Sequence, residues 1–234
     1  MSDLSTRRIG GPHGGEPIAF FGDALEDARA VVLLLHGRGA SAASMQSLAQ
    51  AVDVGGLAFV APQAAGHTWY PHSFLAPLSQ NEPWLESALN VVFYLMKEAR
   101  NPASLPLSRL VVMGFSQGAC LASESVAREA NRYGGLVALS GGLIGTGDIG
   151  GKAAPRDKEF SYEGTLDGTP VFLGCSDVDA HIPVERVEDT ARVLAELGGN
   201  VDKRIYEGMG HTIIQDEIDA VREMLEQVAR SPSD

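Results

Sequence analysis

An apolar segment that ends in a glycine-flanked serine constrains the fold of this chain more than any other feature. Residues 110–118 read LVVMGFSQG, a β-prone run followed directly by small residues that favour a helix. The Gly-x-Ser-x-Gly pattern at 114–118 is typical of a sharp turn from a strand into a helix. Such a turn lifts the serine above the end of a sheet, and the small residues on either side leave room for strand and helix to cross. The segment therefore predicts a nucleophile elbow, with Ser116 as the nucleophile.

Strand-like and helix-like segments alternate along the rest of the chain. The expected strands are 18–22 (an edge strand), 30–36, 57–62, 109–115, 136–141, 169–175 and 200–208. The expected helices are 41–52 with Ser41 as N-cap, 83–100 with Asn81 as cap, 117–131, 183–199 and 212–229. Residues 142–168 are glycine-rich and are expected to be irregular. This alternation predicts an α/β fold in which helices cover both faces of a parallel sheet.

Length and charge limit the domain organisation and the partners. A chain of 234 residues fits one domain, here 17–234, preceded by a flexible N-terminal segment at 1–16. The net charge of −12 argues against a nucleic-acid partner and against tight adsorption to anionic membranes. No stretch approaches the ~20 apolar residues of a membrane span, so membrane insertion is not expected. The start lacks a secretory signal, which makes the cytoplasm the expected location. Cys120 and Cys175 form no disulfide framework and are expected to be buried.

Histidine and aspartate side chains follow the last two predicted strands. His211 lies in a glycine-rich loop after the last strand, where its imidazole can reach the elbow and act as the base for Ser116. The base needs an acid that fixes its tautomer, and the chain order serine, acid, histidine is typical of this fold type. Asp177 and Asp179 both follow the preceding strand. The chemistry alone does not distinguish the two.

Two backbone N–H groups are expected to hold the oxyanion that a serine nucleophile creates. One belongs to Gln117, the residue after the nucleophile, and the other to Arg38 in the glycine-flanked loop after strand 30–36. His36 is expected mainly to hold this loop in shape, with a weaker claim to substrate binding. The side chain of Arg38 is equally compatible with contact to an anionic substrate group and with plain solvation.

An aromatic loop at 67–76 emerges from a strand end, beside the expected site. Trp69, Tyr70 and Phe74 are therefore candidates for lining a substrate pocket, and His181 is expected to be structural or to line the same pocket. Packing within the loop is an equally good interpretation of the aromatics. No histidine pair has the helical spacing of metal ligands, so no metal site is expected.

Four segments together resemble the phospholipase/carboxylesterase family of the α/β-hydrolase superfamily, which includes acyl-protein thioesterases. They are LLHGRG at 34–39, GFSQG at 114–118, DAHIP at 179–183 and GMGH at 208–211. The resemblance implies a three-layer α/β-hydrolase fold over residues 28–230. It also selects Asp179 as the acid, because the family's aspartate is followed by x-x-V/I-P, with Asp177 as second choice. Three departures stand out. Arg38 replaces the family's usual leucine, and GCSDVDAHIP at 174–183 has more residues between the glycine and the acid than the family's pattern. The hydrophobic loop of lipid-handling members is not obvious, and the TWYPHSF segment is similar to bacterial esterase-like members instead.

The resemblance and the residues together indicate a serine carboxylesterase whose substrate is a small-molecule carboxylic ester or thioester. The expected acyl-enzyme mechanism uses Ser116, His211 and Asp179 and needs no cofactor. Alternatives are a lysophospholipase or acyl-protein thioesterase, a dienelactone-hydrolase-like enzyme or a peptidase. A catalytically silent binding protein is a fourth alternative, against which the presence of all three residues argues. A homodimer is common for such folds, and the sequence leaves the oligomeric state open.

Overall fold

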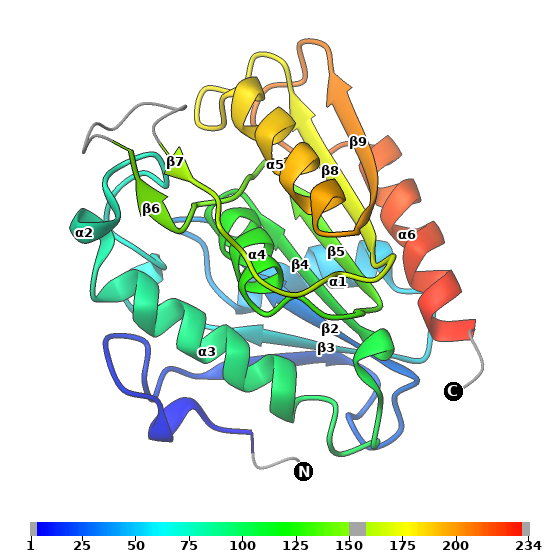
Figure 1. The fold of residues 1–234 in the computed structure, drawn as a ribbon. Coiled ribbons are helices and arrows are strands. Elements are labelled where there is room, and N and C mark those ends of the chain that lie inside the picture. Colours follow the sequence, from blue (N-terminus) through cyan, green and yellow to red (C-terminus); the bar gives the residue numbers. More distant parts are fainter. Residues whose placement is uncertain (1–3, 150–157, 231–234) are drawn as a thin grey trace.

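A seven-stranded, mostly parallel sheet runs through the molecule (Figure 1). The computed structural model describes residues 4–149 and 158–230. The antiparallel strand β1 pairs with β3 at one edge, and the other neighbours are parallel. In spatial order the strands are β1 (Ile18–Gly22), β3 (Leu57–Pro62), β2 (Ala30–Leu35), β4 (Leu110–Phe115), β5 (Gly135–Leu139), β8 (Pro170–Ser176) and β9 (Asn200–Tyr206).

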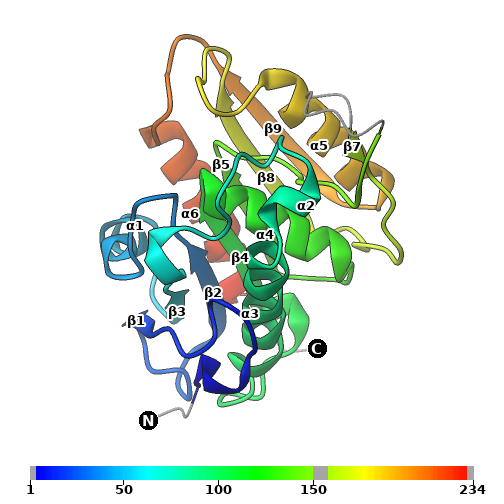
Figure 2. The ribbon, with the colours of Figure 1, turned by 90° about the vertical axis from the view of Figure 1, so that its left-hand side faces the viewer.

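Helices cover both faces of this sheet (Figure 2). One face carries α1 (Gln46–Val52) and α6 (Gln215–Arg230), which contact each other. The opposite face carries α3 (Trp84–Glu98), α4 (Gln117–Arg128) and α5 (Val184–Glu196). A short helix, α2 (Leu78–Asn81), precedes α3, and 3₁₀ turns lie at Thr6–Arg8, Ala43–Met45, Ala65–His67 and Leu107–Arg109. The three-layer α/β architecture predicted from the sequence is confirmed.

The continuous apolar run of β2 shows why the sheet must be covered on both sides. Val31, Leu33 and Leu35 pack with residues of α3 and α4, whereas Ala30, Val32 and Leu34 pack with residues of α1 and α6. Every side chain of the strand is fully buried. A strand of this kind can only lie inside a parallel sheet between two helical layers.

Two expected helix caps differ from the structure. Asn81 does not cap α3, because its buried side chain accepts a hydrogen bond from the His72 N–H (2.9 Å) and donates one to the Ser73 carbonyl (3.0 Å). Ser41 precedes the 3₁₀ turn at Ala43–Met45, where its hydroxyl oxygen accepts from the Ser44 N–H, and α1 begins only at Gln46. In both cases a polar side chain bonds a nearby turn instead of the helix that follows.

The N-terminal segment differs from the expectation of a flexible extension at 1–16. Residues 1–3 lie outside the described residues, but His13 is fully buried. Its Nδ1 accepts from the Ala65 N–H (3.1 Å), and its Nε2 donates to the Trp69 carbonyl (2.9 Å). The glycines in this segment form turns that bring His13 into the core, which composition alone does not distinguish from mobility.

The region expected to be irregular at 142–168 contains a small antiparallel pair, β6 (Gly147–Asp148) with β7 (Lys158–Glu159). The ammonium of Lys158 bonds the Asp148 carboxylate and the carbonyl of Ala76. Residues 150–157, within the same region, lie outside the described residues. Across the described ranges, the helices are too short or too polar to cross a membrane.

Candidate active site

Ser116 occupies a strained turn between β4 and α4, as the elbow pattern predicts. Its φ of 56° and ψ of −120° lie outside the regions that non-glycine residues normally adopt. A Cβ added to Gly114 would lie 2.3 Å from the backbone of Gly118, and one added to Gly118 would lie 2.0 Å from the Leu35 carbonyl oxygen. Both contacts are far too short for any side chain. The glycines are therefore required by the crossing of α4 over β4 and β2.

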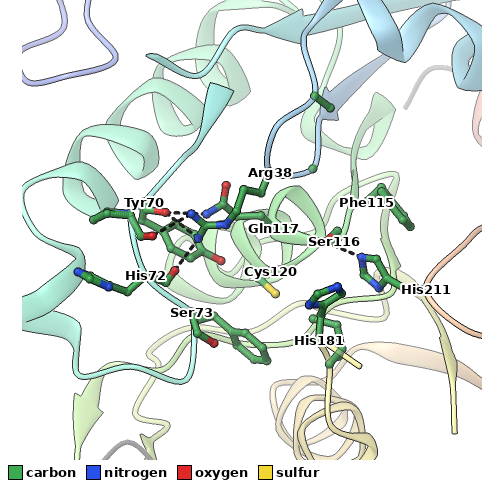
Figure 3. Close-up of a pocket in the computed structure, with 15 residues that line it drawn as sticks. Arg38, Tyr70, His72, Ser73, Phe115, Ser116, Gln117, Cys120, His181 and His211 are labelled. Carbon is green, nitrogen blue, oxygen red and sulfur yellow. Dashed lines mark hydrogen bonds between the residues drawn. The ribbon is translucent and has the colours of Figure 1, made fainter. Parts of the chain in front are cut away.

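His211 bridges Ser116 and Asp179 beyond the carboxyl ends of β4, β8 and β9. Its Nε2 lies 2.8 Å from the Ser116 Oγ (Figure 3), and its Nδ1 lies 2.7 Å from Asp179 Oδ2. A carboxylate bonded to Nδ1 assigns the proton to that nitrogen and leaves Nε2 free to accept the serine hydroxyl proton. The imidazole packs between Phe115 and His181, with ring centroids 5.0 Å and 4.8 Å away. The structure thus brings together the three residues that the sequence analysis singled out.

The two candidate acids have different surroundings. The side chain of Asp179 is fully buried, and its Oδ1 accepts from the N–H groups of His181 (2.8 Å) and Ile182 (3.0 Å). Burial opposes its negative charge, but the hydrogen bonds from His211 and these amides prevail and lower the pKa of Asp179. Asp177 is exposed, and its carboxylate accepts from the Gly208 N–H instead. Asp177 therefore holds the loop that carries His211, and Asp179 meets the imidazole.

Two backbone N–H groups beside Ser116 have no hydrogen-bond acceptor among the described residues. They belong to Arg38, in the loop after β2, and to Gln117, the first residue of α4. A first-turn helix amide has no intrahelical partner, and an amide without an acceptor next to a nucleophile is available to a ligand. These are the two amides that the sequence analysis expected to hold an oxyanion.

A cavity of about 620 Å³ opens beside Ser116. Of the predicted pocket residues, Tyr70, Phe74 and His181 line it. Further lining residues that the sequence analysis did not assign to the pocket are Pro71, His72, Ser73, Phe115, Cys120 and Ile182. In the part of the chain that the structure describes, no group of three or more His, Cys, Asp or Glu residues is placed to hold a metal ion.

His36 and Trp69 do not line the cavity. Both are fully buried, and the indole N–H of Trp69 donates to the His36 carbonyl (2.8 Å). The His36 ring donates from Nδ1 to the Gly37 carbonyl and accepts at Nε2 from the Ala64 N–H. Burial lowers the pKa of this imidazole, which keeps it neutral and able to accept. His36 therefore holds the loop in shape, and its weaker claim to substrate binding is not supported.

The two cysteines are buried, as expected. Burial raises the pKa of the Cys120 thiol to about 11 and that of the Cys175 thiol to about 12. Neither thiol ionises near neutral pH, so Ser116 is the nucleophile that the geometry favours.

Comparisons with known proteins identify the family of this chain. The phospholipase/carboxylesterase family model matches residues 22–229. Acyl-protein thioesterase 1 of Candida albicans is 26% identical over 225 residues, covering 86% of this chain and 93% of that protein. A phospholipase/carboxylesterase from Dyadobacter fermentans has a similar crystal structure, with a TM-score of 0.82, 36% identity, and coverage of 94% of this chain and 100% of that one. The structure of esterase PE8 is also similar, with a TM-score of 0.70, 25% identity, and coverage of 91% and 98%.

The family match spans most of the chain and includes every residue of the site described above. The fold, the elbow and the similar solved structures point to the same class of enzyme. The chain therefore belongs to the phospholipase/carboxylesterase family and is an ester-hydrolysing serine hydrolase with the α/β-hydrolase fold.

Proposed function

We propose that this protein is a carboxylesterase that works through an acyl-enzyme on Ser116. The observation that carries the proposal is the continuous hydrogen-bonded series from the Ser116 Oγ through His211 to Asp179. Ser116 attacks the ester carbonyl carbon while the Nε2 of His211 takes the hydroxyl proton. Asp179 holds the imidazole in its tautomer and stabilises the imidazolium that forms.

The oxyanion of the tetrahedral intermediate is held by the backbone N–H groups of Arg38 and Gln117. Collapse of the intermediate breaks the ester C–O bond, and the alcohol leaves with the proton from His211. Water then attacks the acyl-enzyme with His211 again as base, which releases the carboxylic acid and restores Ser116. Each proton taken up by His211 is returned within the same half-reaction.

The cavity supports a substrate of small-molecule size. Its volume of about 620 Å³ is within the range of small-molecule sites. Thioester hydrolysis is the second candidate, because the curated relative from Candida albicans is named an acyl-protein thioesterase. The serine at the elbow, where a dienelactone-hydrolase-like enzyme would carry cysteine, argues against that alternative. The cytoplasmic location and the homodimer stay predictions.

A paired series of p-nitrophenyl esters and matched thioesters of graded acyl length tests the proposal. We expect wild-type protein to hydrolyse the esters with burst kinetics, and Ser116→Ala to lose on the order of 10⁶ in kcat. Ser47→Ala, which changes an exposed serine of α1, is the matched control and should retain wild-type rates. Hydrolysis by Ser116→Ala at the wild-type rate would refute the assignment of Ser116 as the nucleophile. A kcat/KM that is higher for thioesters throughout the series would favour the second candidate.

A further inference from the structure

The guanidinium of Arg38 is hydrogen-bonded to residues 68–72, of which Tyr70, Pro71 and His72 line one side of the cavity. Its Nη1 donates to the Thr68 hydroxyl (3.0 Å) and the Pro71 carbonyl (2.8 Å). Its Nη2 donates to the carbonyls of Tyr70 (2.9 Å) and His72 (2.6 Å) (Figure 3). Both terminal nitrogens are thus occupied by acceptors of a single five-residue segment. We call this segment the pocket wall.

No carboxylate of the described ranges forms an ion pair with Arg38. Its positive charge is therefore directed at three carbonyl oxygens and a hydroxyl, which makes the bonds charge-assisted and stronger than neutral ones. The pocket wall has no helix or strand of its own, so side chains must fix its shape. Arg38 supplies four of those bonds although it is exposed.

The side chain of Gln117 holds the same wall from the other side. Its Oε1 accepts from the Trp69 N–H (2.9 Å) and the Thr68 hydroxyl (3.2 Å), and its Nε2 donates to the Tyr70 carbonyl (2.8 Å). Arg38 and Gln117 are also the two residues whose backbone amides have no acceptor among the described residues and are assigned to the oxyanion hole by the proposed function. One pair of residues thus contributes amides to the proposed oxyanion hole and side chains to the wall.

We propose that Arg38 is a positioning residue that fixes the pocket wall relative to the oxyanion hole and thereby determines which substrates fit. The proposal rests on the proposed esterase function. The planar fork of a guanidinium reaches four acceptors at once, whereas an ammonium has three donors in a tetrahedral arrangement. Lysine at this position keeps the charge but cannot make the same set of bonds. The alternative, that Arg38 attracts an anionic substrate by its charge, predicts that lysine suffices.

Four variants separate these roles. Arg38→Leu removes both fork and charge, and Arg38→Lys removes the fork alone. Thr68→Val is nearly isosteric and removes one acceptor of the fork, together with the hydroxyl's bond to Gln117. Arg29→Leu is the matched control: it lies at the opposite end of β2 and its guanidinium also bonds a backbone carbonyl, that of Gly55.

The first readout is substrate selectivity, measured as the ratio of kcat/KM between the best ester of the graded series and p-nitrophenyl acetate. We expect Arg38→Leu and Arg38→Lys to lower this ratio by about 10- to 100-fold, chiefly through KM of the larger ester. Thr68→Val should lower it less, and Arg29→Leu should leave it unchanged. Wild-type selectivity in Arg38→Leu, or full rescue by Arg38→Lys, would overturn the proposal.

The second readout is hydrogen exchange of the amides in residues 68–72, which is independent of activity. Exchange should become at least tenfold faster in Arg38→Leu and Arg38→Lys and remain at the wild-type rate in Arg29→Leu. Unchanged exchange in the Arg38 variants would contradict the proposal even if wild-type protein proves inactive towards esters. If Arg38→Leu fails to fold, Thr68→Val and Arg38→Lys still test the same bonds. Failure of the esterase function is thereby distinguishable from failure of the positioning role.

Discussion

The proposed triad and the pocket wall lie side by side but are held in place in different ways. Ser116, Asp179 and His211 each follow a strand of the parallel sheet, so the backbone hydrogen bonds of the sheet determine where they meet. The wall at 68–72 follows β3 through an irregular segment and contains no helix or strand. The comparison teaches that the sheet fixes the chemistry of the site, whereas individual side chains fix its shape.

Three of the side chains that fix the wall come from distant parts of the chain. His13 donates to the Trp69 carbonyl from the N-terminal segment, Arg38 acts from the loop after β2, and Gln117 acts from the start of α4. Each bond joins a side chain to residues about 30 to 60 positions away. A substitution at one of these residues should therefore alter the wall and leave the strand ends in place.

The largest effect is expected on kcat, from substitution of a residue that follows a strand end. Asp179→Asn should lower kcat on the order of 10⁴-fold, because an amide no longer fixes the tautomer of His211 or stabilises the imidazolium. Asp177→Asn is the matched control, since Asp177 bonds only the backbone around the histidine loop. Its kcat should stay within about tenfold of wild type in steady-state ester hydrolysis. The reverse ranking of the two variants would show that the acid is Asp177.

A smaller effect, on folding stability, is expected at Glu217, whose side chain bonds the turn after His211. Its buried carboxylate accepts from the Ile214 N–H, and burial raises the pKa of Glu217 from 4.5 to about 7. A carboxyl with a raised pKa binds more protons in the folded state than in the unfolded one. The contribution of Glu217 to folding stability therefore falls as pH rises from about 4.5 to 7, by on the order of 3 kcal/mol, and levels off above.

Glu217→Gln should abolish this loss, since an amide keeps the acceptor for Ile214 and cannot ionise. The Tm of the variant, measured by circular dichroism, should exceed that of wild type at pH 8 and match it more closely near pH 4.5. Parallel Tm curves for the two proteins between these pH values would disprove the assignment. Ionisation of Glu217 would then have no effect on the stability of the fold.

The smallest effect, on the free energy of unfolding, is expected at His13, which bonds the wall from the N-terminal segment. His13→Leu leaves the buried Trp69 carbonyl and Ala65 N–H without their partner and should destabilise the protein by about 2 kcal/mol in urea unfolding. His72→Leu, which changes an exposed histidine of the wall itself, is the control and should cost less than about 1 kcal/mol. Equal destabilisation by both substitutions would mean that His13 does not support the wall.

The sequence predicts the strand-end region because its signals are local. The apolar run into Gly114, the glycines around Ser116 and the loop after the last strand each indicate a backbone geometry that a parallel sheet imposes. The acid is the exception: Asp177 and Asp179 occupy similar positions in the chain, and only the family resemblance distinguishes them at the sequence level. In the structure, the buried carboxylate of Asp179 contacts His211.

The wall could not be predicted because its hydrogen bonds end on backbone carbonyls. Every residue carries such an acceptor. The sequence of residues 68–72 therefore does not indicate that the Arg38 guanidinium will donate to them. The same reason explains why the sequence predicts a flexible segment around His13 and leaves Trp69 a candidate for the pocket. Each of these side chains is buried and donates a hydrogen bond to a backbone carbonyl. Because any residue can supply that carbonyl, the sequence does not show that the side chain is buried.

The most direct test of the central claim, that the strand ends activate Ser116, is labelling by a fluorophosphonate followed by peptide mass spectrometry. We predict one adduct per folded chain, located on Ser116, formed rapidly in wild-type and Arg38→Lys protein and lost in His211→Ala. Unfolded protein should not react. An adduct elsewhere, or an unmodified Ser116 in folded wild-type protein, would contradict the proposed nucleophile and the mechanism built on it.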